Sequence, residues 1–141
     1  MSAQLALSIG GFESGSIDPG NFDHEAHVYV GWLYLQQNDV EQAIDKFTAA
    51  LKRLTRKLGV ESKYHDTITK FYLILIAERL SSSKSDDWQS FKRDNPDVFA
   101  TQPSVIDRYY SSEKLGSPLA RRQFVLPDRI PALEKSLDSA V

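Results

Sequence analysis

The chain has 141 residues, of which 41% are hydrophobic and 11% aromatic, and its formal net charge is −2. This is enough apolar material for one hydrophobic core, and the near-neutral charge gives no overall attraction to nucleic acid or to anionic membranes. The chain has no cysteine, which excludes disulfides, cysteine nucleophiles and thiolate metal sites. Any metal would therefore be bound through nitrogen and oxygen ligands.

The longest apolar run, residues 71–77, is too short to cross a bilayer, and the N-terminus lacks the basic start of a secretory signal. We therefore expect a cytoplasmic protein with neither a membrane nor a nucleic-acid partner. Residues 1–20 are rich in glycine and serine and are expected to form a flexible or loosely docked N-terminal arm. A single helical domain is expected over residues 21–130, followed by a frayed tail over residues 131–141.

Two helices are predicted in the first half of the domain. The first begins near residue 22, where Asn21 or Asp23 can act as the N-cap, and its apolar residues continue through Leu35. In the second, over residues 40–57, apolar residues recur at steps of three and four, and a basic last turn is followed by Gly59. Its basic cluster is explained by the helix end rather than by a phosphate site.

A third, strongly apolar helix is predicted over residues 63–80, with Ser62 as its N-cap. A strand is the competing interpretation of residues 71–76, but the absence of Gly and Pro favours a helix. A short helix is predicted over residues 88–94, after a polar linker at 81–87. The later prolines leave room only for short helical turns near 104–110 and 117–123. The fold class predicted is all-α, a small antiparallel helical bundle wrapped by a proline-punctuated C-terminal segment.

One part of the pattern resembles a single tetratricopeptide-type helical hairpin over residues 31–51. The matching small, aromatic and alanine positions are Gly31, Tyr34, Ala43, Phe47 and Ala50. The match departs from that repeat at His27 and Thr55, and no second copy follows. The resemblance implies two closely packed helices and, as an alternative function, a helical protein-interaction module without catalysis.

All three histidines fall at predicted helix starts. His24 and His27 are three residues apart and therefore share one helix face, with Gly31 leaving room one turn later. The positive end of the helix favours the neutral, ligating form of His24. His65 lies at the start of the third helix, and an up-down-up arrangement would bring both helix starts to the same end of the bundle.

Three converging imidazoles suit zinc, iron, copper, nickel or manganese. Asp23 and Asp66 would be partners that orient the ring nitrogens, and Asp107 or Asp128 could add a carboxylate from the wrapping segment. Two other interpretations remain open. They are a metal-free, histidine-lined pocket for a small molecule, and histidines that are merely polar residues at helix ends.

Three segments together resemble a small, functionally uncharacterised bacterial all-helical family. They are FDHEAHVYVGWLYL, KYHDTITKFYL and RYYSSEKLGSPLARRQFVLPD, and the resemblance covers roughly residues 22–128. Its pattern has His-x-x-His and Tyr-His-x-Thr-x-Thr helix starts, a Tyr-Tyr-Ser step and an Ala-Arg segment ending in Pro-Asp. The matching positions are His24, His27, Tyr64, His65, Thr67, Thr69, Tyr109, Tyr110, Arg121 and Asp128.

The function expected is that of a metal-binding protein or metal-dependent enzyme acting on a small molecule. Its cofactor would be a divalent transition metal held by His24, His27 and His65. The C-terminal wrap is dense in tyrosine and arginine, which suit carboxylate or phosphate binding, although they also suit anchoring and solvation. We assign a catalytic role to Tyr110 and Arg121, and a substrate-binding role to Tyr64, Thr69, Tyr109 and Arg122.

Overall fold

The protein is all-α, as its sequence predicts. The structure is a computed structural model that describes residues 7–18, 20, 22–82 and 87–129, and this part contains helices and 3₁₀ turns but no strand. The elements in chain order are α1 (Ile9–Ser14), α2 (His24–Gln37), α3 (Val40–Lys57), η3 (Glu61–Lys63), α4 (Asp66–Ser82), α5 (Trp88–Asp94), α6 (Pro96–Phe99), η4 (Val105–Arg108), α7 (Ser112–Leu115) and α8 (Pro118–Arg122). None of the described helices has the length and hydropathy that a bilayer-spanning segment needs.

Aspartate side chains start three of these helices. Asp23, Asp39 and Asp87 each accept a hydrogen bond from the backbone N–H three residues later, at 3.0, 2.8 and 2.8 Å. Such caps satisfy amide groups that have no partner within the helix. The predicted helices at residues 40–57 and 88–94 are confirmed with these bounds. For α2, Asp23 is the cap.

The third helix begins later than predicted. Ser62 was expected to cap it, but Ser62 lies within η3, and α4 begins at Asp66. The chain is extended at Tyr64, so the preceding 3₁₀ turn does not continue into the helix. His65 takes the cap position instead, because its Nδ1 accepts from the backbone N–H of Ile68 at 3.2 Å.

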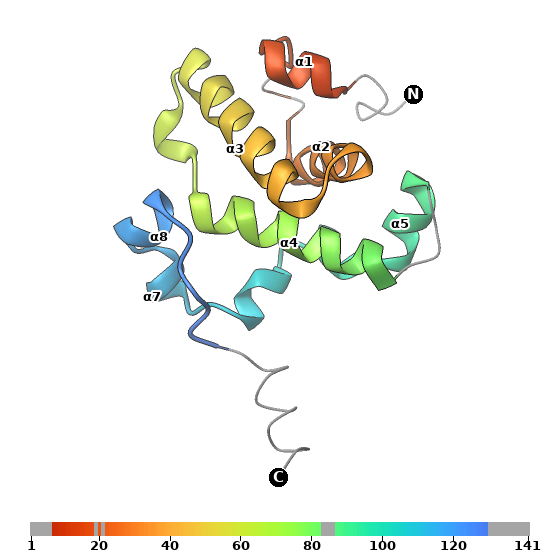
Figure 1. The fold of residues 1–141 in the computed structure, drawn as a ribbon. Helices are drawn as coiled ribbons and strands as arrows, with labels where there is room; N and C mark the ends of the chain where they lie inside the picture. Colours follow the sequence, from red (N-terminus) through yellow and green to blue (C-terminus); the bar gives the residue numbers. More distant parts are fainter. Residues whose placement is uncertain (1–6, 19, 21, 83–86, 130–141) are drawn as a thin grey trace.

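The three long helices α2, α3 and α4 pack against one another and form the centre of the molecule (Figure 1). In Figure 1, α2 is seen nearly along its axis, while α4 runs across the picture. A Cβ added at Gly31 would lie 3.0 Å from Leu73 Cδ2, so the glycine allows α4 to pack tightly on α2. We expected Gly31 to bring α2 close to α3 and to leave room beside the histidines. Leu73 occupies that space instead.

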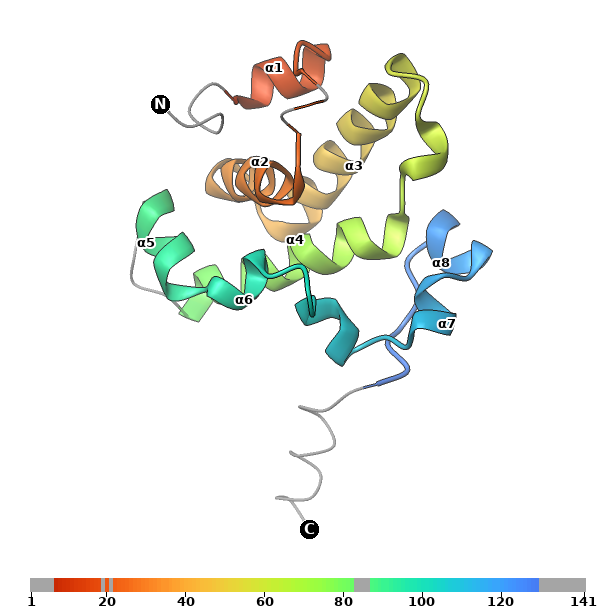
Figure 2. The same cartoon turned by 180° about the vertical axis from the view of Figure 1, so that it is seen from behind.

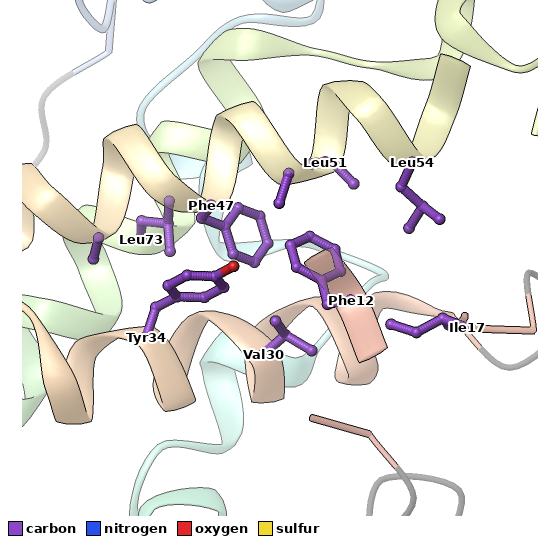
Figure 3. Close-up of a cluster of buried hydrophobic side chains, with 10 residues drawn as sticks. Phe12, Ile17, Val30, Tyr34, Phe47, Leu51, Leu54 and Leu73 are labelled. Atoms are coloured by element: carbon purple, nitrogen blue, oxygen red, sulfur yellow. The ribbon is translucent and has the colours of Figure 1, made fainter. Parts of the chain in front are cut away.

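The expected flexible N-terminal arm contains a docked helix. Phe12 of α1 is completely buried, and its ring centroid lies 5.0 Å from Phe47 and 5.5 Å from Phe22. Figure 3 shows Phe12 among Phe47 of α3 and the Val30 and Tyr34 side chains of α2. The buried Phe12 side chain thus anchors a glycine-rich segment that its composition alone would not predict to be docked. Residues 1–6 lie outside the described part.

The C-terminal segment wraps along α4, and the two turns predicted there correspond to η4 and α8 (Figure 2). The buried Thr67 hydroxyl holds it in place. This hydroxyl donates to Ala120 O at 2.7 Å, lies 3.0 Å from Gln123 O and accepts from the Val125 N–H at 3.2 Å. The predicted tail at residues 131–141 lies outside the described residues, as does most of the predicted linker at 81–87.

Candidate functional site

A pocket of about 490 Å³ lies between α2, α3 and α4 and is also lined by Phe22 and by residues of the α3–α4 connection. This volume is within the range of small-molecule binding sites. Its apolar lining residues are Phe22, Val28, Phe47, Leu51, Leu54, Leu58, Val60, Ile68, Leu73 and Ile76. Its polar lining residues are His24, His27, Thr55, Lys63, Tyr64, His65, Thr69 and Tyr72. The three histidines therefore share one mainly apolar pocket.

His65 uses both of its ring nitrogens for structure. Nδ1 accepts the Ile68 N–H, so this nitrogen carries no proton. Nε2 lies 2.7 Å from the carbonyl oxygen of Leu115, which accepts only, so Nε2 carries the proton and donates it. A neutral imidazole of this tautomer joins the start of α4 to the end of α7.

His24 also hydrogen-bonds to the C-terminal half of the chain. Its Nε2 lies 2.9 Å from Val98 O, so Nε2 is the donor. The ring packs edge-to-face on Tyr72, with 4.8 Å between centroids. Asp23, which we expected to orient a histidine ring, instead caps α2 by accepting from the Ala26 N–H. The Nδ1 atom of His24 makes no hydrogen bond to a described residue.

His27 is the histidine whose nitrogens the described chain does not use. Its ring lies 4.2 Å from that of Phe22, and neither nitrogen hydrogen-bonds to a described residue. Burial and, to a smaller extent, the neighbouring His24 lower the pKa of His27 to about 4 against the opposing effect of Asp23. At neutral pH the ring is uncharged, with one N–H donor and one lone pair.

A metal held by all three histidines needs a free nitrogen on each ring. In this arrangement His65 has none, since Leu115 and Ile68 occupy both. Across the described ranges, no three His, Asp, Glu or Cys side chains are grouped so that they could hold a metal ion. The residues as they lie do not fit the expected metal. The three-histidine site stays a prediction, and it requires His65 to leave one of these partners.

The carboxylates expected to support a metal have other partners. Asp66 accepts from the Tyr64 hydroxyl at 2.6 Å and pairs with Lys70 at 2.8 Å. Asp128 accepts from the backbone N–H of Ser111 at 2.8 Å and from its hydroxyl. Asp107 is exposed and does not line the pocket.

Two of the predicted substrate-binding residues line the pocket, Tyr64 and Thr69. Burial raises the pKa of Tyr64, and its hydrogen bond to Asp66 raises it further, so the phenol remains neutral. The Thr69 hydroxyl donates to His65 O at 2.7 Å, as helical threonines often do to the preceding turn. Both side chains are thus held in fixed orientations on one wall.

Four residues of the C-terminal segment were predicted to belong to the site, and none of them lines the pocket. They are Tyr109, Tyr110, Arg121 and Arg122. Tyr110 is completely buried, its hydroxyl donates to Val125 O at 2.6 Å, and burial raises its pKa to about 12. Tyr109 packs on Phe71, with 5.3 Å between ring centroids. Arg121 donates to Ser62 O at 2.7 Å, and Arg122 is exposed. As they lie, Tyr110 and Arg121 support the fold next to the pocket rather than facing it.

Sequence reasoning missed three polar residues of the lining, Thr55, Lys63 and Tyr72. Tyr72 was detectable, because His65, Thr69 and Tyr72 follow helical spacing on one face of α4. Lys63 was read only as the beginning of a helix. The carbonyl groups of Val98 and Leu115, which fix two of the histidines, have no sequence signal because every residue carries a carbonyl.

Comparison of the chain with protein-family models, with curated proteins and with solved structures gave no match.

Proposed function

We propose that the protein binds a small, mainly apolar molecule in the pocket between α2, α3 and α4, with one hydrogen-bonding group of that molecule held by His27. The observation that supports this most directly is the position of His27. It lines a mainly apolar pocket, and its ring nitrogens have no partner among the described residues.

The His27 side chain is half-buried, and its ring nitrogens lie at the pocket without a partner among the described residues. A ligand that supplies a donor or acceptor to His27 therefore adds one hydrogen bond, worth about 0.5–1.5 kcal/mol net. Burial of its apolar part against Phe47, Leu51, Leu54 and Leu73 adds about 25 cal/mol for each Å² of apolar surface. One polar anchor within an apolar cavity is the usual composition of a small-molecule site.

The protonation state of His27 favours recognition over base catalysis. An imidazole whose pKa is lowered to about 4 is a weak base at neutral pH, whereas efficient general bases have pKa values near the working pH. The same neutral ring is well suited to exchanging hydrogen bonds with a bound molecule. The proposal is therefore for binding, and it includes no reaction step.

The interaction-module alternative would use the hairpin of α2 and α3 as an open binding surface. In the structure, α1 packs onto this hairpin through Phe12, and α4 packs onto it at Gly31. The faces of the hairpin that would receive a peptide are thus occupied by the chain itself. This packing supports a small-molecule pocket more strongly than it supports an interaction module.

Binding can be tested with Nile red, an uncharged dye whose fluorescence rises in apolar surroundings. We expect saturable binding by the wild-type protein and loss of it in Thr55→Trp, which places an indole at the pocket wall on α3. The matched control is Ala49→Trp, an exposed position on the same helix outside the lining. Equal binding by the two tryptophan variants would contradict the proposal.

The role of His27 needs a separate comparison of 2-naphthol with naphthalene, which differ by one hydroxyl group. We expect the wild type to prefer 2-naphthol by about fivefold, the value of one net hydrogen bond of roughly 1 kcal/mol. In His27→Phe the preference should disappear while naphthalene still binds. A preference that persists in His27→Phe would show that another group recognises the hydroxyl.

A further inference from the structure

The α3–α4 side of the pocket is surrounded by cations. Lys63 lines the pocket and is exposed, so the cavity reaches solvent at η3. Two further cations flank the lining residue Tyr64. The Lys52 ammonium lies 5.3 Å from the centre of its ring, and Arg121 Nη1 lies 3.4 Å from its carbonyl oxygen. Of these three cations only Lys63 of η3 lines the pocket, while Lys52 of α3 and Arg121 of α8 lie beside its lining residue Tyr64. We call the three together the cationic rim.

The acidic groups nearest this rim already have partners. Glu61 pairs with Arg56 at 3.8 Å, and Asp66 pairs with Lys70 at 2.8 Å. No Asp or Glu of the described residues lines the pocket. Lys52, Lys63 and Arg121 have no carboxylate partner within the described part of the chain. The rim therefore carries an uncompensated positive charge.

Resting on the proposed function, we propose that the ligand is an anionic amphiphile, a carboxylate with an apolar body, whose head group lies at the exposed Lys63, close to Lys52 and Arg121, while its apolar part fills the pocket. The walls formed by Leu51, Leu54 and Leu73 accept the apolar part. A polar atom along that body, distant from the carboxylate, then meets His27 on the pocket wall.

This orientation avoids the main cost of binding an anion. A carboxylate buried among apolar side chains would lose its hydration, whereas one at an exposed lysine keeps most of its water and gains attraction from the cations. The same charges disfavour an amine in this position and give a neutral molecule no electrostatic gain. The rim thus selects for charge, and the interior selects for shape and hydrophobicity.

The test compares three ten-carbon ligands of equal chain length, namely decanoate, 1-decanol and decylammonium, by displacement of Nile red from the full chain. We expect decanoate to bind about tenfold more tightly than 1-decanol, and decylammonium to bind most weakly. Raising NaCl from about 0.05 M to about 0.5 M should reduce the preference for decanoate, because exposed charges are screened.

Lys63→Glu is expected to weaken decanoate binding about tenfold or more and to leave 1-decanol binding unchanged. The control, Lys46→Glu, makes the same charge change at an exposed lysine whose described partner is the neutral amide of Asn38, at 2.7 Å. Equal affinity for decanoate and 1-decanol, or equal effects of the two variants, would overturn the anionic ligand while leaving the pocket intact. Failure of Nile red to bind at all would instead remove the proposed function on which this inference rests.

Discussion

The Nε2 atom of His65 lies 2.7 Å from the carbonyl oxygen of Leu115, a residue 50 positions later in the chain. The other nitrogen of the same ring caps α4 by accepting the Ile68 N–H at 3.2 Å. One neutral imidazole therefore closes the start of a central helix and fastens the C-terminal wrap to it. Its structural role competes with any role as a metal ligand.

Two substitutions of His65 should separate the contributions of these two hydrogen bonds to the free energy of unfolding. His65→Ala loses both and is expected to reduce the free energy of unfolding by about 1–3 kcal/mol. His65→Asn keeps a good capping side chain and loses the bond to Leu115, so its loss should be smaller. Urea denaturation measures both values. Unchanged stability in His65→Ala would show that neither bond contributes.

The predicted metal can be tested on the same variant. If His24, His27 and His65 bind a metal, the untagged protein should contain one equivalent by elemental analysis, and His65→Ala should lose it. The hydrogen bonds of His65 lead us to expect no stoichiometric metal after incubation with zinc, iron, copper, nickel or manganese. One tightly bound equivalent that depends on His65 would show that the ring leaves Leu115 or Ile68.

The attachment of the wrap to α4 depends on the buried hydroxyl of Thr67. Thr67→Val keeps the shape but leaves the Val125 N–H and the Ala120 carbonyl without this partner, and we expect a loss of about 1–3 kcal/mol. Thr48→Val is the matched control, because the buried Thr48 hydroxyl bonds only to carbonyls of its own helix. Equal losses in the two variants would contradict the role given to Thr67.

Docking of α1 makes a testable contribution to stability. Phe12→Ala removes a completely buried ring that packs on Phe22 and Phe47, and a loss of about 3–5 kcal/mol is expected. Because Phe22 and Phe47 also line the pocket, Nile red binding should weaken as well. A loss below about 0.5 kcal/mol would instead fit the flexible arm expected from the sequence.

The lowered pKa of His27 predicts how stability changes with pH. Between its usual pKa of 6.5 and the folded value of about 4, the unfolded chain binds a proton at this residue that the folded protein does not. Unfolding is therefore favoured as the pH falls through this window, and the contribution of His27 to stability is fully present above pH 6.5. Urea denaturation at several pH values should show a shallower slope for His27→Gln than for the wild type.

Hydrophobic spacing was enough to predict the helices over residues 40–57 and 88–94, because apolar residues three and four positions apart are a local signal. It failed at the start of α4. By residue type Ser62 is the better cap, but the backbone is extended at Tyr64, so the helix starts only after it and His65 takes the cap position. Phe12 was missed for a related reason, since one aromatic residue in a glycine-rich segment has no periodicity.

His24, His27 and His65 line one pocket, but among the described residues they are not grouped closely enough to hold a metal ion, so the expected convergence on a common ligand stays a prediction. Their hydrogen-bonding state was not predictable, because the partners of two rings are backbone carbonyls 74 and 50 positions away. The roles predicted for Tyr110 and Arg121 depended on residue type and on the family resemblance, and neither reveals whether a side chain faces a pocket or the core.

The most direct test of the pocket is a methyl ¹H–¹³C NMR titration of the labelled protein with Nile red. We predict that the largest shifts will occur at Leu51, Leu54, Leu73 and Ile76, which line the pocket, while the exposed Leu119 and Leu126 remain unchanged. Shifts confined to Leu119 and Leu126, or no shifts at saturating dye, would contradict the existence of a binding site between α2, α3 and α4.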